Sequence, residues 1–361
     1  MIDKNSIRQQ IDATDEELLA LINKRLHLAQ TIGEIKNREE LAVLDPKREQ
    51  EVLDHLRRFN TGPLSDDGLR NIFREIISAA RQVQRPLSVA FLGPEATFTH
   101  LAAIKKFGRS TLFKPLPTIA EVFMAVEKGN HHLGVVPIEN STEGVVNETL
   151  DNFVDTKVQI CGEIYLEISH DLISRSGQIQ DIEIIYTHPH AFGQCRQWLQ
   201  RHLPQIPVLE VSSTGLAAQK AAQNPNSAAI ASGFAASLYD LQVVEPHIED
   251  HRENATHFFI IGPYTPGATG TDKTSIIFAV VDEPGALYNM LRPLAQRGIN
   301  MTRIVSRPMK TIAWRYLFFV DIDGHREETA VGACLQEMEA RSAFFKILGS
   351  FPRAEAVEKI S

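Results

Sequence analysis

The first 38 residues carry the feature that most limits the fold, a single long helical repeat. Between residues 5 and 38, apolar side chains recur at spacings of three, four and seven, with no proline and only one glycine, Gly33. The apolar positions are Ile7, Ile11, Leu18, Leu21, Leu28, Ile32 and Ile35. At 1.5 Å per residue a helix of this length spans about 50 Å, more than the width of a small domain. We therefore expect its apolar stripe to pack against a second copy of the chain.

Two shorter helices follow the long one. In "LDPKREQEVLDHL", Asp45 is placed to cap a helix whose first residue is Pro46, a position that proline favours. The stretch "NTGPLSDDG" predicts a turn, and "LRNIFREIISAARQVQ" predicts a third helix that ends before the Arg85-Pro86 step. We therefore expect residues 1–85 to form an all-α domain of three helices.

The rest of the chain divides into two further blocks. Residues 87–264 alternate buried strands, polar loops and helices, as in "LSVAFLGPEATF", "HHLGVVPIEN" and "DIEIIYTHPHAF", which predicts an α/β domain with ligands at the loop ends. Residues 262–273 are rich in Gly, Pro and Thr and are typical of a linker. Residues 273–361 follow the order βαββαβ, which predicts an α+β domain of the ferredoxin-like kind.

Charge and cysteine content exclude several classes of protein. The net charge of −8 over 361 residues argues against nucleic-acid binding, which favours a basic surface. The N-terminal residues lack the pattern of an export signal, and no apolar run reaches the roughly 18 residues of a membrane span. Three scattered cysteines, Cys161, Cys195 and Cys334, fit neither a disulfide framework nor a zinc site. We therefore expect a cytoplasmic protein in which the Asn-x-Ser/Thr motifs at Asn140, Asn147, Asn254 and Asn300 do not serve glycosylation.

Cations are spaced along the long helix in a way that separates them into two sets. Arg25 and Lys36 are eleven residues apart, which returns them to within about 20° of the same face. Arg8 lies seventeen residues before Arg25, roughly 260° around the helix, and so does not join them within one chain. Taken alone, this spacing also fits an ordinary solvated helix face.

Residues 5–85 resemble the all-helical chorismate mutase family, through "IRQQID", "NKR", "GEIK", "DPKRE" and a closing glutamine. The resemblance implies a dimer of swapped long helices in which Arg8 enters the partner's site. The rearrangement of chorismate to prephenate needs no nucleophile and no proton transfer, only a compact hold on a dicarboxylate and stabilisation of the ether oxygen. The resemblance assigns the carboxylates to arginines, the ether oxygen to a lysine and a glutamine, and the substrate hydroxyl to a glutamate. The implied site is Arg8, Arg25, Lys36, Asp45, Arg48, Glu49 and Gln84.

Residues 87–264 resemble prephenate dehydratase in five collinear stretches, "AFLGPEATFTHLAA", "VVPIENSTEGVV", "THPHAFGQC", "SSTGLAAQ" and "NATHFFII". The resemblance implies two α/β subdomains around a cleft, like type II periplasmic binding proteins, and the conversion of prephenate to phenylpyruvate. Thr256 would donate a hydrogen bond to the departing hydroxide. Implied substrate contacts are Thr97, Asn140, Ser141, Thr142, His188, Ser213, Thr214, His257 and Phe258. For any one hydroxyl, turn or helix-cap chemistry is the alternative, and Glu143 also fits a capping role.

Three positions depart from the dehydratase pattern. Ala96 stands where the family has glycine, His190 ends a motif that is usually His-Pro-Gln, and His257 replaces the arginine of Thr-Arg-Phe. We expect a protonated His257 to replace part of the arginine's charge beside Thr256, since imidazole titrates near neutral pH.

The last block resembles the ACT domain, a regulatory module that binds small molecules. The matching stretches are "GAL" and "VSRP", in which Val305 replaces the usual glutamate. The resemblance implies phenylalanine bound between two ACT domains of a dimer, its carboxylate at a helix N-terminus. The implied residues are Gly285, Ala286, Leu287, Asn300, Ser306, Arg307 and Pro308. A dimerisation module without a ligand is the alternative.

The whole chain resembles the family of bifunctional chorismate mutase–prephenate dehydratases of phenylalanine biosynthesis. The resemblance implies a homodimer or higher homo-oligomer that acts on chorismate and prephenate, responds to phenylalanine and needs no metal or organic cofactor. Two alternatives stay open. One is a sensor that binds aromatic metabolites without turnover because of His257, and the other is an enzyme with only the mutase active.

Overall fold

The computed structural model describes residues 3–39, 44–251, 253–281, 283–308, 316–354 and 357–358. The chain divides into two compact units, the first made of residues 1–88 and 107–112 and the second of residues 89–106 and 113–361. No helix in the described ranges is both long enough and apolar enough to cross a membrane.

The first unit contains the three predicted helices, α1 (Lys4–Arg38), α2 (Pro46–Phe59) and α3 (Asp66–Gln84). The side chains of Asp3, Asp45 and Ser65 cap them by accepting hydrogen bonds from backbone N–H groups in the first turn. α1 packs against α3. Most of its apolar stripe stays exposed, with Leu21 and Leu28 each 62% exposed. The stripe is therefore not covered within one chain, as the sequence predicts.

The second unit begins with a seven-stranded sheet in the order β16-β5-β11-β3-β1-β2, with the short β4 beside β3. The β1–β3 pair is parallel, and β11 is antiparallel to both β3 and β5. The strands are β1 (Ser88–Leu92), β2 (Leu112–Leu116), β3 (Leu133–Asn140), β4 (Gly144–Val145), β5 (Gln159–Glu167), β11 (Ala255–Gly262) and β16 (Val357–Glu358). The helices of this part are α4 (Phe98–Phe107), α5 (Ile119–Glu127) and α6 (Asn147–Asp155). Residues 147–149 begin α6, which gives the Asn-x-Thr motif at Asn147 a place in the first turn of a helix.

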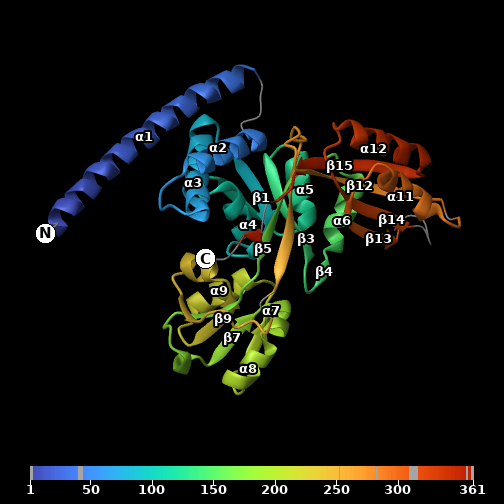
Figure 1. Cartoon of the computed structure of the whole chain (residues 1–361). Coiled ribbons are helices and arrows are strands. Elements are labelled where there is room, and N and C mark those ends of the chain that lie inside the picture. Colours follow the sequence, from blue (N-terminus) through green and yellow to red (C-terminus); the bar gives the residue numbers. More distant parts are fainter. Residues whose placement is uncertain are drawn as a thin grey trace. The chain divides into compact units, whose positions relative to one another are not determined.

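A second sheet has the order β10-β6-β9-β7-β8 and lies below the first one in Figure 1. Its strands are β6 (Asp171–Ser174), β7 (Ile184–Thr187), β8 (Val208–Glu210), β9 (Ser227–Ala231) and β10 (Gln242–Glu245). Its helices are η1 (Ile179–Asp181), α7 (Pro189–Gln194), α8 (Arg196–His202), α9 (Thr214–Gln223) and α10 (Gly233–Leu238). The chain crosses between the sheets twice, and the N–H of Ile168 donates to the carbonyl of Asn254 at 2.8 Å where the crossings meet. The prediction of two α/β subdomains is confirmed.

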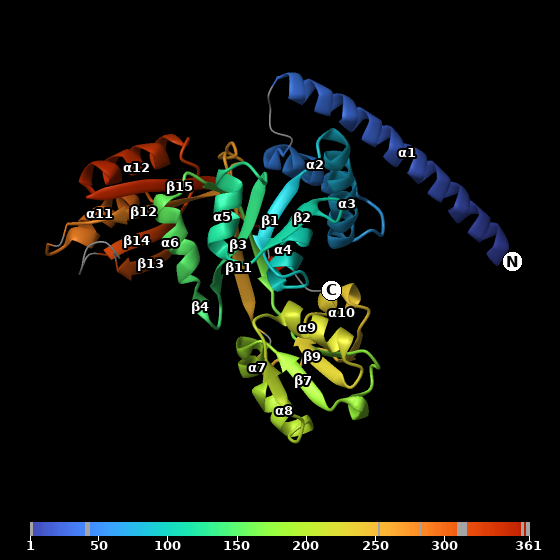
Figure 2. The same cartoon turned by 180° about the vertical axis from the view of Figure 1, so that it is seen from behind.

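The C-terminal part forms a four-stranded sheet in the order β13-β14-β12-β15 with two helices on one face (Figure 2). Its elements are β12 (Asp272–Ala279), α11 (Ala286–Gln296), β13 (Met301–Pro308), β14 (Tyr316–Asp323), α12 (Thr329–Arg341) and β15 (Phe344–Pro352). This confirms the ferredoxin-like prediction, except that residues 313–315 of the strand expected at 313–323 lie outside the described residues. The face without helices shares a core with the first α/β sheet, where Ile277 and Phe319 pack in one cluster with Phe153 and Phe259.

Candidate active sites

In the helical unit, a small group of polar side chains is buried between α1, α2 and α3. Gly33 permits the close approach of α1 to the end of α3, because a Cβ at that position would lie 2.9 Å from the Cα of Gln84. Arg25 is half-buried, and burial lowers the pKa of its guanidinium while the nearby Glu49 carboxylate raises it. In the described part of the chain, neither Arg25 Nη1 nor Gln84 Oε1 has a hydrogen-bond partner, although both atoms are buried. Buried polar groups without partners are expensive, so this group is suited to a polar ligand.

The structure brings only part of the predicted mutase set to this place. Arg25 lies near Glu49, Gln84 lies against Gly33 eight residues further along α1, and Lys36 is half-buried one turn beyond Gly33. Arg8 is exposed and lies seventeen residues earlier on the same helix, about 26 Å from Arg25 along the axis. It therefore does not reach the group of its own chain.

Two members of the predicted mutase set have other partners. The Asp45 carboxylate accepts from the N–H of Arg48 at 3.0 Å, which is the helix cap predicted from the sequence. The exposed guanidinium of Arg48 forms an ion pair with Glu51 at 3.1 Å. Arg81 was not among the predicted residues. It is buried, pairs with Glu49 at 3.3 Å and donates to the Phe107 carbonyl at 2.6 Å. Its position one turn before Gln84 on α3 was the signal that could have identified it.

In the α/β part, the side-chain amide of Asn140 organises the end of β3 and the start of β11. Asn140 and Thr256 are paired in register across these strands. Asn140 Nδ2 donates to Thr256 Oγ1 and to Asn254 Oδ1, both at 2.8 Å. Asn140 Oδ1 accepts from the backbone N–H of Thr142 at 3.0 Å and from its hydroxyl at 2.6 Å. The Ser141 hydroxyl also donates to Asn254 Oδ1, at 3.2 Å.

The hydroxyl of Thr256 is left with a proton to donate. Its oxygen accepts from Asn140, the residue is only 9% exposed, and no acceptor for its proton lies within hydrogen-bond distance among the described residues. A neutral hydroxyl held by an amide donor on one side is oriented and still able to donate on the other. This arrangement suits the stabilisation of a leaving hydroxide next to an anionic substrate.

Gln194, at the end of α7 in the second subdomain, ties this cluster together. Its Nε2 donates to the Thr142 hydroxyl at 3.0 Å, and its Oε1 accepts from Asn254 Nδ2 at 3.0 Å. His170 Nε2 lies 2.8 Å from the same Oε1. Asn254, Gln194 and His170 were missed as site residues, although the first two lie inside motifs quoted from the sequence. His170 carries no such signal.

The remaining predicted hydroxyls form a second group around the N-terminus of α9. Ser213 caps α9 by accepting from the N–H of Leu216 at 3.0 Å, and Thr214 follows it. The Thr97 hydroxyl donates to the Pro94 carbonyl at 3.0 Å. The two segments approach so closely that a Cβ on Gly215 would lie 2.2 Å from the Glu95 carbonyl oxygen. Ser213 and Thr97 therefore act as cap and loop residues, and among the described residues their hydrogen bonds do not reach Thr256.

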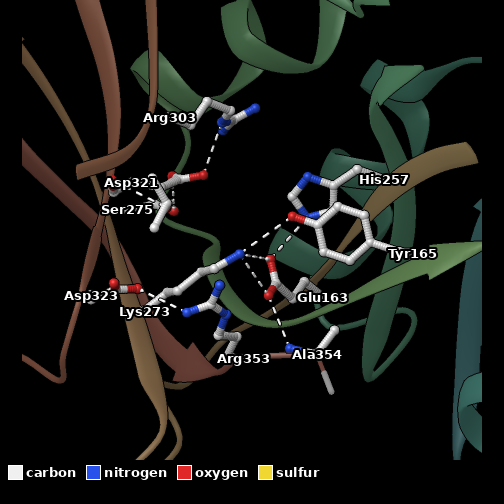
Figure 3. A network of polar contacts seen from close by, with 11 residues as sticks. Glu163, Tyr165, His257, Lys273, Ser275, Arg303, Asp321, Asp323, Arg353 and Ala354 are labelled. Carbon is white, nitrogen blue, oxygen red and sulfur yellow. Dashed lines mark hydrogen bonds and ion pairs between the residues drawn. The ribbon is translucent and has the colours of Figure 1, made fainter. Parts of the chain in front are cut away.

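Three predicted substrate contacts have other surroundings. His188 caps α7 by accepting from the N–H of His190 at 3.3 Å, and burial lowers the pKa of His188. Phe258 is a core side chain, 1% exposed. The expectation that His257 acts beside Thr256 is wrong, because successive strand residues point to opposite faces. His257 Nε2 instead lies 2.9 Å from Glu163 Oε2, and its ring stacks on Tyr165 (Figure 3).

The predicted ACT-domain residues are divided between two surroundings. Gly285 adopts φ 80° and caps α11, and Leu287 packs in the core under the helices. Arg307 is turned toward the α/β part, where its Nη2 contacts both carboxylate oxygens of Asp151 on α6, at 2.6 and 2.7 Å. Asn300 Nδ2 donates to Asp323 at 3.1 Å. The other predicted positions are Ala286, the first residue of α11, and Ser306 and Pro308, both exposed on β13.

Comparison with known proteins gives the same three parts in the same order. The family models for chorismate mutase type II, prephenate dehydratase and the ACT domain match residues 7–85, 89–265 and 274–339. A bifunctional chorismate mutase/prephenate dehydratase from Aquifex aeolicus is 44% identical over 358 residues, which cover 98% of this chain and 99% of the relative. The chain belongs to this bifunctional family.

Other relatives agree with this assignment. The bifunctional chorismate mutase/prephenate dehydratase of Pseudomonas aeruginosa is 42% identical over 97% of both chains. The crystal structure of a prephenate dehydratase from Arthrobacter aurescens in complex with L-Phe is 33% identical, has a TM-score of 0.69, and covers 76% of this chain and 93% of its own. Among the described residues of this bifunctional chain, no group of three His, Cys, Asp or Glu side chains has the arrangement of a metal site.

Proposed function

We propose that this chain converts chorismate to prephenate in its helical unit and prephenate to phenylpyruvate in its α/β domain, under feedback inhibition by phenylalanine at the ACT domain. Membership of the bifunctional family supports the pair of reactions. The observation that carries the second reaction is the hydrogen bond from Asn140 to Thr256, which leaves the Thr256 proton free to donate.

The mutase reaction needs a cationic and hydrogen-bonding cage around a dianion. Arg25 supplies a guanidinium with a buried N–H that has no partner among the described residues, and Gln84 lies against Gly33, with Lys36 one turn further along α1. Glu49 is positioned to accept from the substrate hydroxyl, with Arg81 holding its carboxylate. The second carboxylate clamp is Arg8 of another copy of the chain. This requires a homodimer built on the exposed α1 stripe, and Asp45 and Arg48 then support the fold of α2 rather than the chemistry.

The dehydratase reaction breaks two bonds of prephenate together. The ring carboxylate leaves as CO2, its bonding electrons enter the ring, and the ring hydroxyl departs with the electrons of its C–O bond. Thr256 donates a hydrogen bond to the departing oxygen, and a proton from solvent completes the water molecule. Asn140, Ser141 and Thr142 present short polar groups at the same place, and Gln194 brings the second subdomain against them. Thr97, Ser213, Thr214 and His188 stay as candidates for the more distant carboxylate of the substrate.

Regulation and location complete the proposal. Phenylalanine binds at the ACT domain of a homodimer, with Gly285, Ala286 and Leu287 at the start of α11 and Asn300, Ser306, Arg307 and Pro308 on or beside β13. The three cysteines are free and buried, which fits a reducing compartment and therefore the cytoplasm.

One assay tests the main proposal against its alternatives. Purified full-length protein is given chorismate, and prephenate and phenylpyruvate are followed over time, with Thr256→Ala beside the wild type. We expect prephenate and then phenylpyruvate in the wild type, and prephenate alone in Thr256→Ala. Prephenate that accumulates in the wild type identifies a mutase-only enzyme, and binding without turnover identifies a sensor. A wild-type dehydratase rate that does not change with added phenylalanine removes the regulatory part.

A further inference from the structure

A buried carboxylate, Glu163, joins the strand that carries Thr256 to the ACT domain. Glu163 lies on β5 with its side chain fully buried. It faces three donors from three segments, namely His257 Nε2 on β11 at 2.9 Å, Lys273 Nζ on β12 at 2.9 Å, and the N–H of Ala354 after β15 at 3.0 Å. Figure 3 shows the lysine and the imidazole meeting the same carboxylate.

Tyr165 closes the cluster from one side. Its ring stacks on His257 with a centroid distance of 4.1 Å and an interplanar angle of 10°. Its hydroxyl accepts from Lys273 Nζ at 3.3 Å, and the ammonium also lies 5.4 Å from the ring centroid. The side chains of His257 and Lys273 are only 5% and 6% exposed. Each polar group is therefore held by the others, with little help from solvent.

The charge of Glu163 depends on these neighbours. Burial by itself raises the pKa of the carboxyl, but the hydrogen bond from His257 and the charges of His257 and Lys273 outweigh burial and lower the pKa to about 2. If the ammonium is removed, a fully buried anion loses its counter-ion and must take up a proton or move toward its remaining donors. Two donors then remain, the backbone N–H of Ala354 and the imidazole of His257. Because His257 lies on β11, the disturbance passes to that strand.

Disturbance at His257 reaches Thr256 through the backbone. The two residues are neighbours in β11, and the β3–β11 pairing shifts register one residue further on, between His257 and Phe258, where β3 passes from Glu139 to Pro137. The extra residue of this bulge is Ile138 on β3, two residues before Asn140, and a bulge bends its strand and redirects the neighbouring side chains. The ring of His257 and the hydroxyl of Thr256 are thus set by the same short piece of backbone.

We propose that Glu163 is a positioning residue for the dehydratase reaction and that Lys273 is the ACT-domain group that acts on it. Lys273 of the ACT domain holds Glu163 by an ion pair, and Glu163 holds the ring of His257 by a hydrogen bond. The position of His257 in turn sets the position of the strand end that carries Thr256. A phenylalanine-bound ACT domain that shifts β12 then changes the geometry of the Asn140–Thr256 pair. This inference rests on the proposed dehydratase activity and its inhibition by phenylalanine.

Lys273→Met in the full-length chain tests the inference, because methionine keeps the length of the side chain and removes its charge. We expect the phenylalanine concentration for half-inhibition to rise about 10-fold or more, which is within the usual range of coupling between two sites. The dehydratase kcat falls about 3- to 10-fold while KM changes less than about twofold, because the substrate contacts stay in place. The mutase rate of the same sample is unchanged.

Lys346→Met is the matched control. Lys346 is also an ACT-domain lysine that reaches the dehydratase domain, where its Nζ donates to the carbonyls of Phe153 at 2.7 Å and Val154 at 3.1 Å, near the end of α6. Among the described residues, the hydrogen bonds of its ammonium do not reach Glu163 or β11. Equal loss of inhibition in Lys346→Met and Lys273→Met assigns the effect to domain docking in general and overturns the inference.

The double variant Glu163→Gln/Lys273→Met separates coupling from stability. It removes the unpaired buried charge, so its Tm returns toward the wild-type value. We expect inhibition by phenylalanine to stay weak in it. Recovery of inhibition together with Tm shows a purely structural role and overturns the inference. A wild type without dehydratase activity, or one that phenylalanine does not inhibit, defeats the proposed function instead, and that result is read before any variant is compared.

Discussion

In the helical unit, Arg25 Nη1 and Gln84 Oε1 are buried without partners in the described chain, whereas in the dehydratase domain the amide of Asn140 alone contacts Thr256, Asn254 and Thr142. The first site has a hydrogen-bond donor and an acceptor that are left for a ligand to satisfy. The second site has already used most of its hydrogen bonds to hold one hydroxyl in place. Both are polar sites of similar residue types, so the difference lies in what completes them.

This difference follows from the chemistry and from the folds. A rearrangement needs only that the substrate be held in a compact conformation. Charged and polar groups that have no partner until the substrate binds can do this. An elimination that needs one well-aimed donor is served by a network that fixes that donor in advance. The first site also lies on a helix whose apolar stripe is exposed, while the second is built from strands of a closed core. In the proposed assignment, one chain therefore completes the dehydratase site, whereas the mutase site takes Arg8 from a second chain.

Removal of the Thr256 hydroxyl is the largest single test of this contrast. Thr256→Val keeps the shape of the side chain, and we expect the dehydratase kcat to fall by about 10³-fold, or about 4 kcal/mol of transition-state stabilisation, measured as phenylpyruvate formation. The mutase rate of the same sample does not change. Thr149→Val is the control, because that buried hydroxyl bonds the Pro137 carbonyl instead. A Thr256→Val enzyme within threefold of wild type would falsify the role given to Thr256.

Complementation tests whether the mutase site needs two chains. Arg8→Ala and Arg25→Ala each lose about 2–4 kcal/mol, or about 10²-fold in mutase rate, because each removes a charged clamp. When the two variants are unfolded and refolded together in equal amounts, half of the dimers are mixed, and each mixed dimer contains one intact site. About a quarter of the wild-type mutase activity then returns. If Arg8 serves its own chain, mixing restores nothing, and the contrast between the two sites is lost.

How far the sequence predicts these sites depends on whether the contacts are local. Asn140, Ser141 and Thr142 were predicted because they form one contiguous motif, and Asn140 meets Thr256 by strand pairing. Gln194 and His170 reach the cluster only through the crossing of two subdomains, and nothing in their local pattern indicates that contact.

The misplacement of His257 has a different cause. Adjacency to Thr256 in the sequence suggested adjacency in the site, although alternate residues of a strand face opposite ways. The fold was predicted more fully, because helix caps and the succession of helices and strands along the chain depend on the local sequence. The packing of the ACT sheet against the dehydratase core was not predicted, yet the unbroken apolar run "IIFAVV" (276–281) is typical of a strand buried on both faces.

The stability of the protein in acid tests the charged groups that connect the dehydratase domain to the ACT domain. The pKa of Glu163 is lowered from 4.5 to about 2, chiefly because the hydrogen bond and charges of His257 and Lys273 outweigh burial. A lowered carboxyl pKa gives stability that is present above pH 4.5 and is lost as the pH falls toward 2. The shift corresponds to about 3 kcal/mol. We expect Glu163→Gln to be less stable at pH 7 and to lose less stability than wild type between pH 4.5 and 2, measured by urea unfolding. Parallel acid profiles in the two proteins contradict this.

Gln194→Leu tests whether the second subdomain helps to hold the site. Leucine removes the bonds to Thr142 and Asn254 and leaves their polar atoms with fewer partners. We expect a loss of about 1–2 kcal/mol, or about 10-fold, in the dehydratase kcat/KM, with the mutase rate unchanged. Gln200→Leu on the exposed face of α8 is the control. An unchanged kcat/KM in Gln194→Leu shows that the first subdomain is sufficient.

The smallest expected effect concerns the loop that approaches α9. Ala96 has φ 63°, a left-handed conformation that glycine adopts freely, and its methyl group is buried beside Ala217 and Ala218. Ala96→Gly relieves about 1 kcal/mol of backbone strain but gives up about 0.8 kcal/mol of burial and increases the freedom of the unfolded chain. We therefore expect a change of less than about 1 kcal/mol in the free energy of unfolding, followed by denaturant titration. Ala96→Val, which adds a β-branched side chain at the same φ, is expected to destabilise several times more. A large gain from Ala96→Gly would mean that the wild-type loop holds more strain than the φ of Ala96 alone accounts for, and that the dehydratase site is less completely prepared within one chain than its hydrogen bonds indicate.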